Sequence, residues 1–252
     1  MKRKSSNYLL PKALLIDIDD TLIGPKPGAN PPSGISGDWT SSLMSILPEA
    51  GKVLGGLTAE EAGHRIKQVC TQVEWWHWSD FIKALEIDDG DFWNYAHEME
   101  SAYLDSTGTE VRDALLRLRS VGFKLYITSN NPNDGIRHKL KLGNLWEENG
   151  EQIFSRLLGV SGFRAMKWER AYWQKILQHV DLAPDEVAVI GDSLHDDFEV
   201  PHSAGIRRFF IIDRTEDRSA SSDDTVTYVR NFTQIADMLT ACVKPDAIPI
   251  QL

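Results

Sequence analysis

Short apolar runs recur along the chain, and turn residues such as Gly, Asn and Asp bound most of them. A run of this kind is typical of a strand that a sheet buries on both faces. The runs that predict strands are residues 13–16, 123–128, a short run near Ile153, 187–190, 208–212 and 227–229. The first of them ends abruptly in acidic residues.

Between the later strands, apolar residues recur every three or four positions, which is the spacing of one face of an α-helix. This spacing predicts helices over 109–119, 133–142, 167–180 and 232–239. Gly122, just beyond the first of these helices, is typical of a residue that ends one. Strands that alternate with helices predict an α/β fold, in which a Rossmann-like parallel sheet is covered on both faces.

The stretch between the first two predicted strands departs from this alternation. Residues 24–37 contain four prolines and four glycines, a composition that predicts a linker rather than a core element. Thr58 and Glu61 have the spacing of a capping box that opens a helix. Ser79 and Asp91 are candidate N-terminal caps of two further helices. The stretch therefore predicts a small all-helical unit.

Residues 106–108 (Ser-Thr-Gly) predict a return linker at the end of this helical stretch. The two linkers divide the chain into a core domain and an insertion. We expect the core to consist of residues 1–24 and 106–252, and the inserted helical domain to span residues 25–105. At 252 residues, the chain has a suitable length for one core domain with such an insertion.

Charge and cysteine content narrow the class of protein. The net charge of −10 argues against nucleic acid as a partner and gives no reason to expect an anionic membrane surface. Cys70 and Cys242 are far apart and form no CxxC motif, which favours a reduced, cytoplasmic protein. The N-terminal residues lack the apolar core of a secretion signal, and no apolar run is long enough to predict a membrane span.

Polar residues end or follow three of the predicted strands. Asp17 and Asp19 follow the first strand, and because they are two positions apart, their side chains project to the same side of an extended chain. Ser129 ends the second strand, and Asp192 follows a later one. In an open α/β sheet, such groups meet beyond the carboxyl ends of the strands. We expect one site there, in which Asp17 and Asp19 serve as a nucleophile and an acid.

Further charged residues surround this expected site. Asp196 and Asp197 lie in the loop that Asp192 begins, and Lys167 precedes that strand by one helix. Three carboxylates (Asp17, Asp192 and either Asp196 or Asp197) would repel one another by about 4 kcal/mol for each pair at ~4 Å and an effective dielectric constant of ~20. A divalent cation relieves this repulsion, and Mg²⁺ favours a few carboxylates together with a substrate phosphate. With Lys167 the charges then sum to zero, so a phosphate dianion can enter.

These motifs, taken in order, resemble those of the haloacid dehalogenase superfamily of hydrolases over about residues 12–240. The matching motifs are DIDDT (17–21) for DxDx[TV], TSN (128–130) for the Ser/Thr motif, Lys167 for the lysine, and GDSLHDD (191–197) for GDxxxxD. The 25 positions from Lys167 to Asp192 are the spacing expected of the branch with a helical cap domain. One departure is Trp168, where that branch usually has proline, and Arg164 is the alternative cation.

The resemblance implies a role for each matching residue. Asp17 would attack phosphorus and form an aspartyl-phosphate, and Asp19 would protonate the leaving group and then activate water. The implied Mg²⁺ ligands are Asp17, the backbone carbonyl of Asp19, Asp192 and Asp197 (or Asp196). The residues expected to contact the phosphate are Thr21, Ser129, Asn130 and Lys167.

Three tryptophans at positions 75, 76 and 78 form a dense cluster in the predicted helical insertion. Two interpretations stay open for them. They can form the hydrophobic core of the insertion, or Trp75 and Trp78 can line the binding site for the organic part of a substrate.

Residue 19 distinguishes the reaction types of the superfamily. The dehalogenases and phosphonatases of that superfamily lack an aspartate at that place, whereas phosphate esters need a protonated leaving group. The sequence therefore predicts a Mg²⁺-dependent phosphatase for a small phosphorylated metabolite, acting as a monomer or homodimer. Two alternatives stay open: a sugar phosphomutase, which uses the same acid, and a non-catalytic binding protein on this fold.

Overall fold

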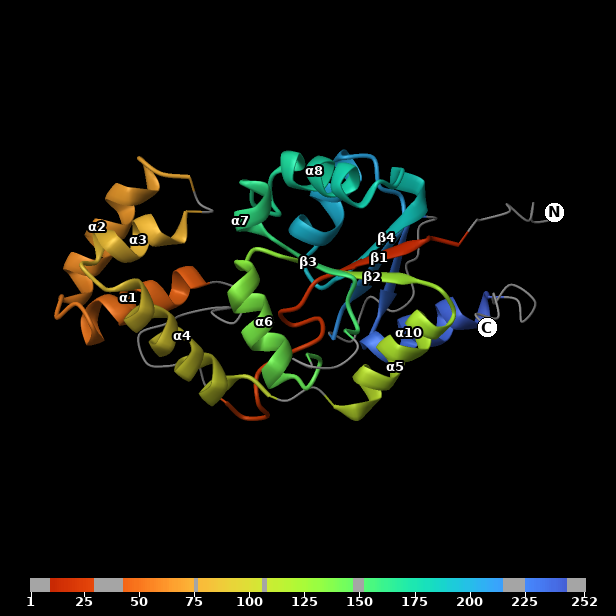
Figure 1. The fold of residues 1–252 in the computed structure, drawn as a ribbon, viewed down its shortest axis with the longest axis horizontal. Coiled ribbons are helices and arrows are strands. Elements are labelled where there is room, and N and C mark those ends of the chain that lie inside the picture. The colour runs from red at the N-terminus through yellow and green to blue at the C-terminus, as the bar shows by residue number, and fades with distance from the viewer. Residues whose placement is uncertain are drawn as a thin grey trace.

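The structure is a computed structural model that describes residues 10–29, 43–74, 77–105, 108–146, 152–214 and 225–243. These residues contain a six-stranded parallel sheet in the order β3-β2-β1-β4-β5-β6. The strands are β1 (Ala13–Ile16), β2 (Lys124–Ser129), β3 (Arg156–Gly159), β4 (Val187–Gly191), β5 (Phe209–Ile212) and β6 (Val226–Val229). The sheet confirms the predicted Rossmann-like α/β fold (Figure 1).

The strand β1 lies in the interior of the sheet because its side chains are apolar on both sides. Leu14 and Ile16 pack into one hydrophobic cluster, and Ala13 and Leu15 pack into another on the opposite face. All four side chains are fully buried. A strand that must bury both faces needs a layer of helices on each side.

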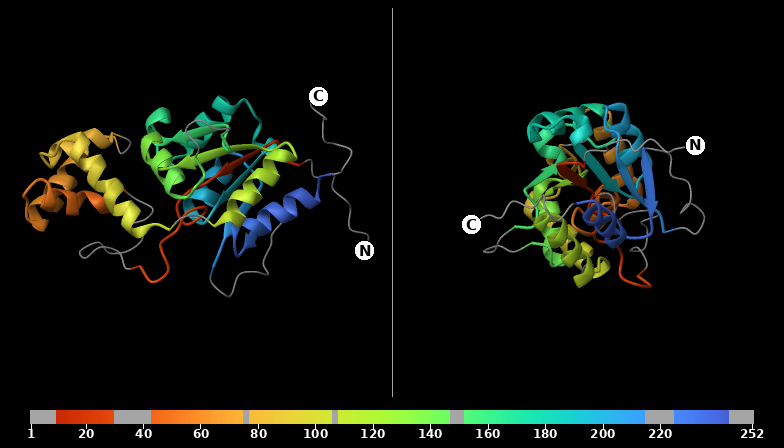
Figure 2. Two further views of the ribbon diagram at one scale, coloured as in Figure 1. Left: turned by 60° about the horizontal axis from the view of Figure 1, so that its bottom comes forward. Right: turned by 90° about the vertical axis from the view of Figure 1, so that its right-hand side faces the viewer.

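Two layers of helices cover the sheet (Figures 1 and 2). One layer consists of α5 (Thr109–Ser120), α6 (Asn133–Leu142) and α10 (Phe232–Ala241), and the other of α7 (Val160–Phe163), α8 (Arg170–Val180) and α9 (Val200–Ser203). The helix α8 begins three residues later than predicted because residues 166–169 form a turn, closed by a hydrogen bond from the Glu169 amide to the Met166 carbonyl. Within the described ranges, no helix combines the length and the apolar character needed to cross a membrane.

In its described residues, the stretch between β1 and α5 forms four helices with a hydrophobic core of their own, which we call the inserted block. Its helices are α1 (Leu43–Val53), α2 (Ala59–Cys70), α3 (Trp78–Ala84) and α4 (Asp89–Tyr103). Phe81 and Phe92 are fully buried in its core. Figure 1 shows the block beside the sheet domain, at the left of the view. This is the all-helical stretch expected from the sequence, while domain limits at residues 25 and 105 stay a prediction.

Three N-terminal cap residues were predicted in the inserted block, and one of these predictions is confirmed. The Thr58–Glu61 capping box is present at the start of α2. Ser79 does not cap a helix, because α3 already begins at Trp78. Asp91 lies inside α4, and Asp88 is the cap, accepting hydrogen bonds from the backbone N–H groups of residues 90 and 91. Several acids stand close together there, so residue type alone did not identify the cap.

The chain leaves and re-enters the sheet domain through two segments that lie side by side. The backbone N–H of Asp105 donates to the Gly24 carbonyl over 2.9 Å, and Pro25 and Leu104 form an antiparallel bridge. The predicted linkers therefore meet at one place, as far as their described residues show. The remaining residues of these linkers (30–37 and 106–107) lie outside the described ranges.

The inserted block also touches the sheet domain through α4, which packs against α6. The rings of His97 on α4 and His138 on α6 are stacked, with centroids 3.9 Å apart and planes inclined by 12°. Next to this pair, Glu100 of α4 reaches Lys139 of α6. The helix that follows β2 thus joins the sheet to the inserted block.

Candidate active site

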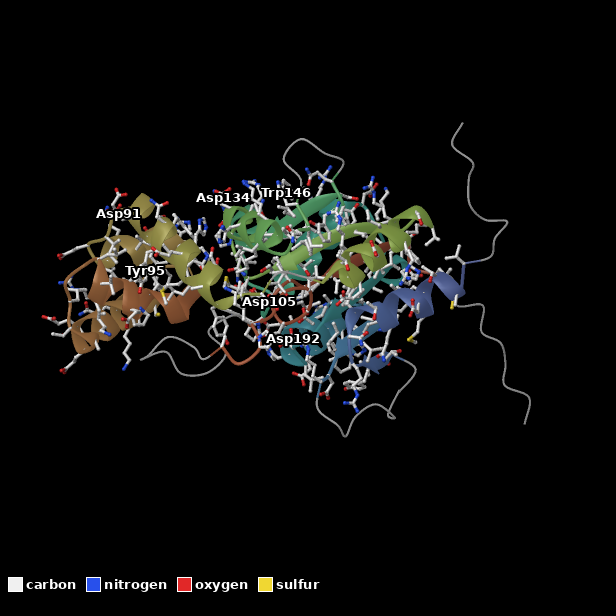
Figure 3. All side chains as sticks on the ribbon, turned by 90° about the horizontal axis from the view of Figure 1, so that it is seen from below. Asp91, Tyr95, Asp105, Asp134, Trp146 and Asp192 are labelled. Carbon is white, nitrogen blue, oxygen red and sulfur yellow. The ribbon has the colours of Figure 1, made fainter. Side chains whose placement is uncertain are left out.

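Acidic and hydroxyl side chains gather beyond the carboxyl ends of three adjacent strands. Asp17 directly follows β1, Ser129 is the last residue of β2, and Asp192 directly follows β4. Because β2 and β4 both pair with β1 in parallel, these residues reach the same edge of the sheet. Figure 3 shows Asp192 on the sheet domain, away from Asp91 and Tyr95 on the inserted block.

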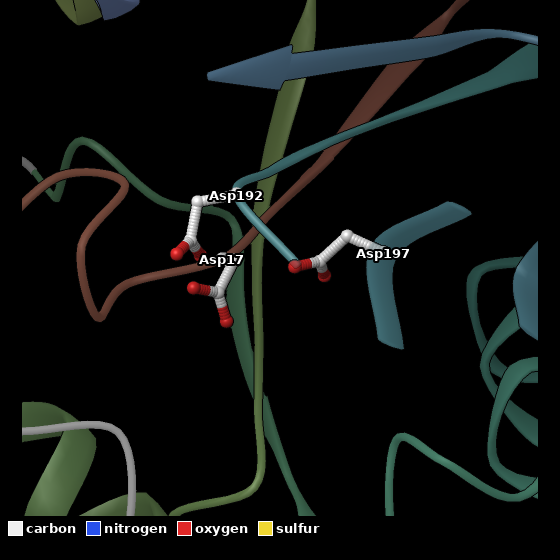
Figure 4. Close-up of side chains that lie close together, drawn as sticks. All are labelled: Asp17, Asp192 and Asp197. Atoms are coloured by element: carbon white, nitrogen blue, oxygen red, sulfur yellow. The ribbon is translucent and has the colours of Figure 1, made fainter. Parts of the chain in front are cut away.

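Asp17, Asp192 and Asp197 form a group that we call the acidic trio. One carboxylate oxygen from each lies within 4.8 Å of those of the other two. Figure 4 shows the three side chains together at the ends of their elements. Asp197 comes from a π-helical turn at His195–Glu199, and its side chain is fully buried.

Gly191 at the end of β4 leaves the space that Asp197 occupies. A Cβ atom at this position would lie 2.2 Å from the Cγ of Asp197, far closer than packing allows. The backbone N–H of Ser193 donates to Asp197 Oδ2 over 3.2 Å. The glycine and this hydrogen bond together hold the carboxylate against the end of the strand.

Lys167 places its ammonium group between two members of the trio. Its Nζ lies 2.5 Å from Asp17 Oδ1 and 2.7 Å from Asp197 Oδ1, and the side chain is buried. The backbone of Lys167 is held on both sides, since its N–H donates to Asn130 Oδ1 and its carbonyl accepts from Trp173 Nε1. The predicted lysine therefore lies in the site, in the turn that directly precedes α8.

The side chain of Asn130 joins two loops of the site. Its oxygen accepts from the Lys167 backbone, and its Nδ2 donates to Asp196 Oδ2 over 3.0 Å. Asp196 also contacts His195 Nδ1 at 2.8 Å. Asp197 rather than Asp196 therefore belongs to the trio. A contact between Asn130 and phosphate stays a prediction.

The turn after β1 brings two more predicted residues to the same edge. Asp20 adopts a left-handed conformation with φ of 51°, which aspartate tolerates better than most residues. Its backbone N–H donates to the Ile23 carbonyl and closes the turn. Thr21 Oγ1 then lies 3.5 Å from Asp192 Oδ1, and Asp19 lies buried beside Asp17.

Asp19 has its own set of hydrogen-bond donors. Lys139 Nζ lies 2.5 Å from Asp19 Oδ1, and Asn131 Nδ2 donates to Asp19 Oδ2 over 2.8 Å. The same amide group of Asn131 also donates to Ser129 Oγ over 2.9 Å. One asparagine thus fixes the distance between the Asp19 carboxylate and the Ser129 hydroxyl.

Sequence reasoning missed Lys139, Asn131 and Glu100, which surround Asp19. Lys139 did carry a signal, because it follows Ile136 by three positions on the buried side of a predicted helix. A lysine at such a position needs a buried partner. Glu100 gave a weaker signal, since its partner lies 39 positions away in sequence on another domain.

Burial and mutual repulsion raise the pKa of all three carboxyl groups of the trio. Burial is the largest cause for Asp17, to which the neighbouring carboxylates add and which Lys167 opposes. The pKa of Asp192 is raised to about 7, first by burial and then by Asp197. Burial also raises the pKa of Asp197 against the effect of Lys167. The pKa of Lys167 is raised, because the charges of Asp17 and Asp197 outweigh the lowering effect of burial.

The donor set of the trio fits a hard divalent cation. Three carboxylates and one ammonium group leave a net charge of −2 at the edge of the sheet. Their oxygens are close enough to share one ion, and Mg²⁺ prefers ligands of this kind. Burial is the first cause of the raised pKa values, and repulsion between the carboxylates adds to it at Asp17 and Asp192, where Lys167 opposes both effects.

The two predicted tryptophan contacts have different outcomes. Trp78 is 5% exposed and packs in the core of the inserted block, with its ring centroid 6.2 Å from that of Phe81. This position agrees with the first interpretation, the core of the insertion, and a role for Trp78 as a lining for substrate stays a prediction. Trp75 lies outside the described residues, and its role stays a prediction.

The chain is similar to known hydrolases in sequence and in fold. Residues 11–205 match the family model for haloacid dehalogenase-like hydrolases. Similar structures include a haloacid dehalogenase-type phosphatase from Thermococcus onnurineus, with a TM-score of 0.60 and 24% identity over 90% of this chain and 97% of that one. No curated protein sequence matches the chain significantly.

Two further structures carry different activities in their names. A putative β-phosphoglucomutase from Thermotoga maritima has a TM-score of 0.54 and 20% identity, over 92% of this chain and 99% of that one. A 2-haloacid dehalogenase from Pseudomonas syringae pv. Tomato DC3000 has a TM-score of 0.60 and 19% identity over the same shares. At these identities the structures show a common fold, and the matched family model shows that the chain belongs to the haloacid dehalogenase-like hydrolases.

We expect the metal-free protein to lose stability as Asp192 ionises. In the folded state its pKa is raised to about 7, whereas an aspartate in the unfolded chain has a pKa of ~3.9. Between these values the folded protein binds a proton that the unfolded chain has released. The contribution of the neutral carboxyl is therefore fully present below about pH 4 and is lost as the pH rises to about 7. Chemical unfolding in EDTA at about pH 5 and about pH 8 measures this loss.

The matched control is Asp192→Asn, which cannot ionise at this position. The pKa of His138 is lowered to about 4 by burial and by His97, so His138 titrates in the opposite sense. Because it is present in both proteins, its effect cancels in their difference. If wild type and Asp192→Asn show the same change in unfolding free energy with pH, the raised pKa of Asp192 is wrong.

Proposed function

We propose that this haloacid dehalogenase-like hydrolase is a Mg²⁺-dependent phosphatase that acts on a small phosphate monoester through an aspartyl-phosphate on Asp17. The observation that carries the proposal is the position of Asp19, which is buried next to the trio and oriented by Lys139 and Asn131. A leaving alkoxide needs a proton, which such an acid can supply. A halide leaves without one, so the arrangement favours phosphate esters over haloacids.

In the first step, the Asp17 carboxylate attacks phosphorus. The bond between Asp17 Oδ and phosphorus forms as the bond from phosphorus to the leaving oxygen breaks, and the proton of Asp19 passes to that oxygen. Lys167 orients the Asp17 carboxylate through its contact with Oδ1. Ser129 Oγ is positioned by Asn131 at the same edge, where it can donate to a phosphoryl oxygen. Positioning of this kind supplies much of the catalysis in phosphoryl transfer.

In the second step, water attacks the phosphorus of the aspartyl-phosphate. Asp19, now a carboxylate, accepts a proton from that water, and the bond to Asp17 breaks. Inorganic phosphate leaves, and both aspartates return to their starting states. The two donors to Asp19 hold its carboxylate in one place through both steps.

Asp17, Asp192 and Asp197 would hold the cation, together with the backbone carbonyl of Asp19. Mg²⁺ at these residues would neutralise their charge and stabilise negative charge on the phosphoryl group. Lys167 remains between Asp17 and Asp197 and completes a site with no net charge. A phosphate dianion then meets no repulsion from the trio.

We expect Asp17→Asn to retain the fold and to lose about 10⁴-fold or more in kcat, because an amide is a far weaker nucleophile than a carboxylate. Release of inorganic phosphate from p-nitrophenyl phosphate with Mg²⁺ measures the loss. Turnover close to that of the wild type would contradict the assignment. Isomerisation of a sugar phosphate without net release of phosphate would indicate a phosphomutase instead.

We expect Asp19→Asn to affect substrates according to their leaving groups. A good leaving group departs without a proton, so p-nitrophenyl phosphate should still phosphorylate Asp17 in a single-turnover burst. An alkyl phosphate should lose about 10²- to 10⁴-fold in the same step, the usual contribution of a general acid. Rapid-quench measurement of the leaving alcohol distinguishes the two substrates. An equal loss on both would argue against proton transfer by Asp19.

We expect Mg²⁺ to raise the unfolding free energy by about 2.7 kcal/mol at 100 times its Kd, because the ion binds the folded trio and not the unfolded chain. Asp192→Ala should abolish this gain. The control Asp196→Ala should keep it, since Asp196 lies outside the trio. A melting temperature that Mg²⁺ does not change in the wild type would contradict the proposed metal site.

A further inference from the structure

A second buried lysine lies behind the proposed acid. Lys139 is 1% exposed, and its Nζ lies 2.5 Å from Asp19 Oδ1 and 3.3 Å from Glu100 Oε1. Glu100 is itself 3% exposed. The side chains of Asp19, Lys139 and Glu100 thus form a continuous series of contacts, enclosed by protein, from the end of β1 to the inserted block.

The two carboxylates that Lys139 contacts belong to different parts of the molecule. Asp19 follows β1 in the sheet domain, and Glu100 lies on α4 of the inserted block. The contact exists only where α4 packs on α6, next to the stacked rings of His97 and His138. Lys139 therefore connects the contact between α4 and α6 to the candidate active site.

The geometry of Lys139 depends on Glu100. An ammonium group on a flexible four-carbon stem has several positions open to it, and its partners select among them. Glu100 on one side and Asp19 on the other both restrain the position of the Lys139 ammonium group. Burial keeps water from replacing either carboxylate. A change in the position of Glu100 is therefore transmitted to Asp19.

We propose that Lys139 is a positioning residue that aligns Asp19 for proton transfer, and that Glu100 makes this alignment depend on the docking of α4 against α6. The proposal rests on the proposed function, in which Asp19 protonates the leaving group. Lys139 itself does not touch the reacting atoms. It acts through Asp19, and Glu100 acts through Lys139.

The test measures how the rate depends on the leaving group. A series of substituted phenyl phosphates differs in the acidity of the leaving phenol but little in size. We expect Lys139→Met to lower kcat/KM for phenyl phosphate by about 10- to 100-fold, and to lower it for p-nitrophenyl phosphate by less than about threefold. The plot of log kcat/KM against leaving-group pKa becomes steeper. The matched control, Lys141→Met, changes an exposed lysine of the same helix and should leave the plot unchanged.

Glu100 is tested by Glu100→Gln, which retains the shape of the side chain and removes its charge. This variant should steepen the same plot less than Lys139→Met does. The double variant should be no steeper than Lys139→Met alone, because the two residues act in series. An additive effect in the double variant would contradict the role of Glu100. If Lys139→Met does not fold, the slope of the Glu100→Gln variant decides the proposal.

A purely structural role for this series of contacts gives a different result. Every substrate in the series would then lose the same factor, and the slope of the plot would not change in any variant, which would overturn the inference. Asp19→Asn is measured in parallel. If Asp19→Asn steepens the plot and the Lys139 and Glu100 variants do not, only this inference fails. If Asp19→Asn also leaves the slope unchanged, the assignment of Asp19 fails, and the inference fails with it.

Discussion

The repulsion between carboxylates at one edge of the sheet is the constraint on which this site depends. Parallel strands bring Asp17 and Asp192 to one edge, and the turn after β4 adds Asp197. Buried carboxylates that are not fully balanced are costly, and one of them can be balanced by Lys167. In the proposed function, a divalent cation would balance the remaining excess of negative charge. With all three carboxylates ionised, the fold thus leaves two negative charges at this edge without a lysine or arginine partner in the trio.

Residues next to the acidic trio hold its carboxylates close together. Gly191 has no side chain, so Asp197 can press against the end of β4. Asn130 joins the loop that carries Lys167 to the π-helical turn that carries Asp196. Gly191 and Asn130 are themselves neutral. They position the charged residues without adding to the charge of the site.

The elements that could be predicted from sequence are those whose signals are local. The apolar run before Asp17 and the alternation of strands with helices indicated the sheet, and with it the convergence of Asp17, Ser129 and Asp192. The choice between Asp196 and Asp197 required the π-helical turn and the space beside Gly191, which no local pattern encodes.

Contacts across long sequence distances were not predictable in the same way. Lys139 was recognisable as an unusual residue on a buried helix face. Its two partners lie 120 and 39 positions away, so only the folded chain identifies them. Trp78 gave no comparable signal. A tryptophan is common both in a core and on a binding surface, so only its neighbours in the fold place it in the core.

The two segments that connect the inserted block to the sheet domain lie side by side at one end of α4. The bridge between Pro25 and Leu104 adjoins the C-terminal end of α4, and Glu100 precedes Leu104 by four residues, about 6 Å at the rise of an α-helix. The whole helix of 15 residues is about 22 Å long. If the block rotated about this bridge, the distal end of α4 would move farthest. Glu100 would move only a fraction of that distance, because it lies closer to the bridge.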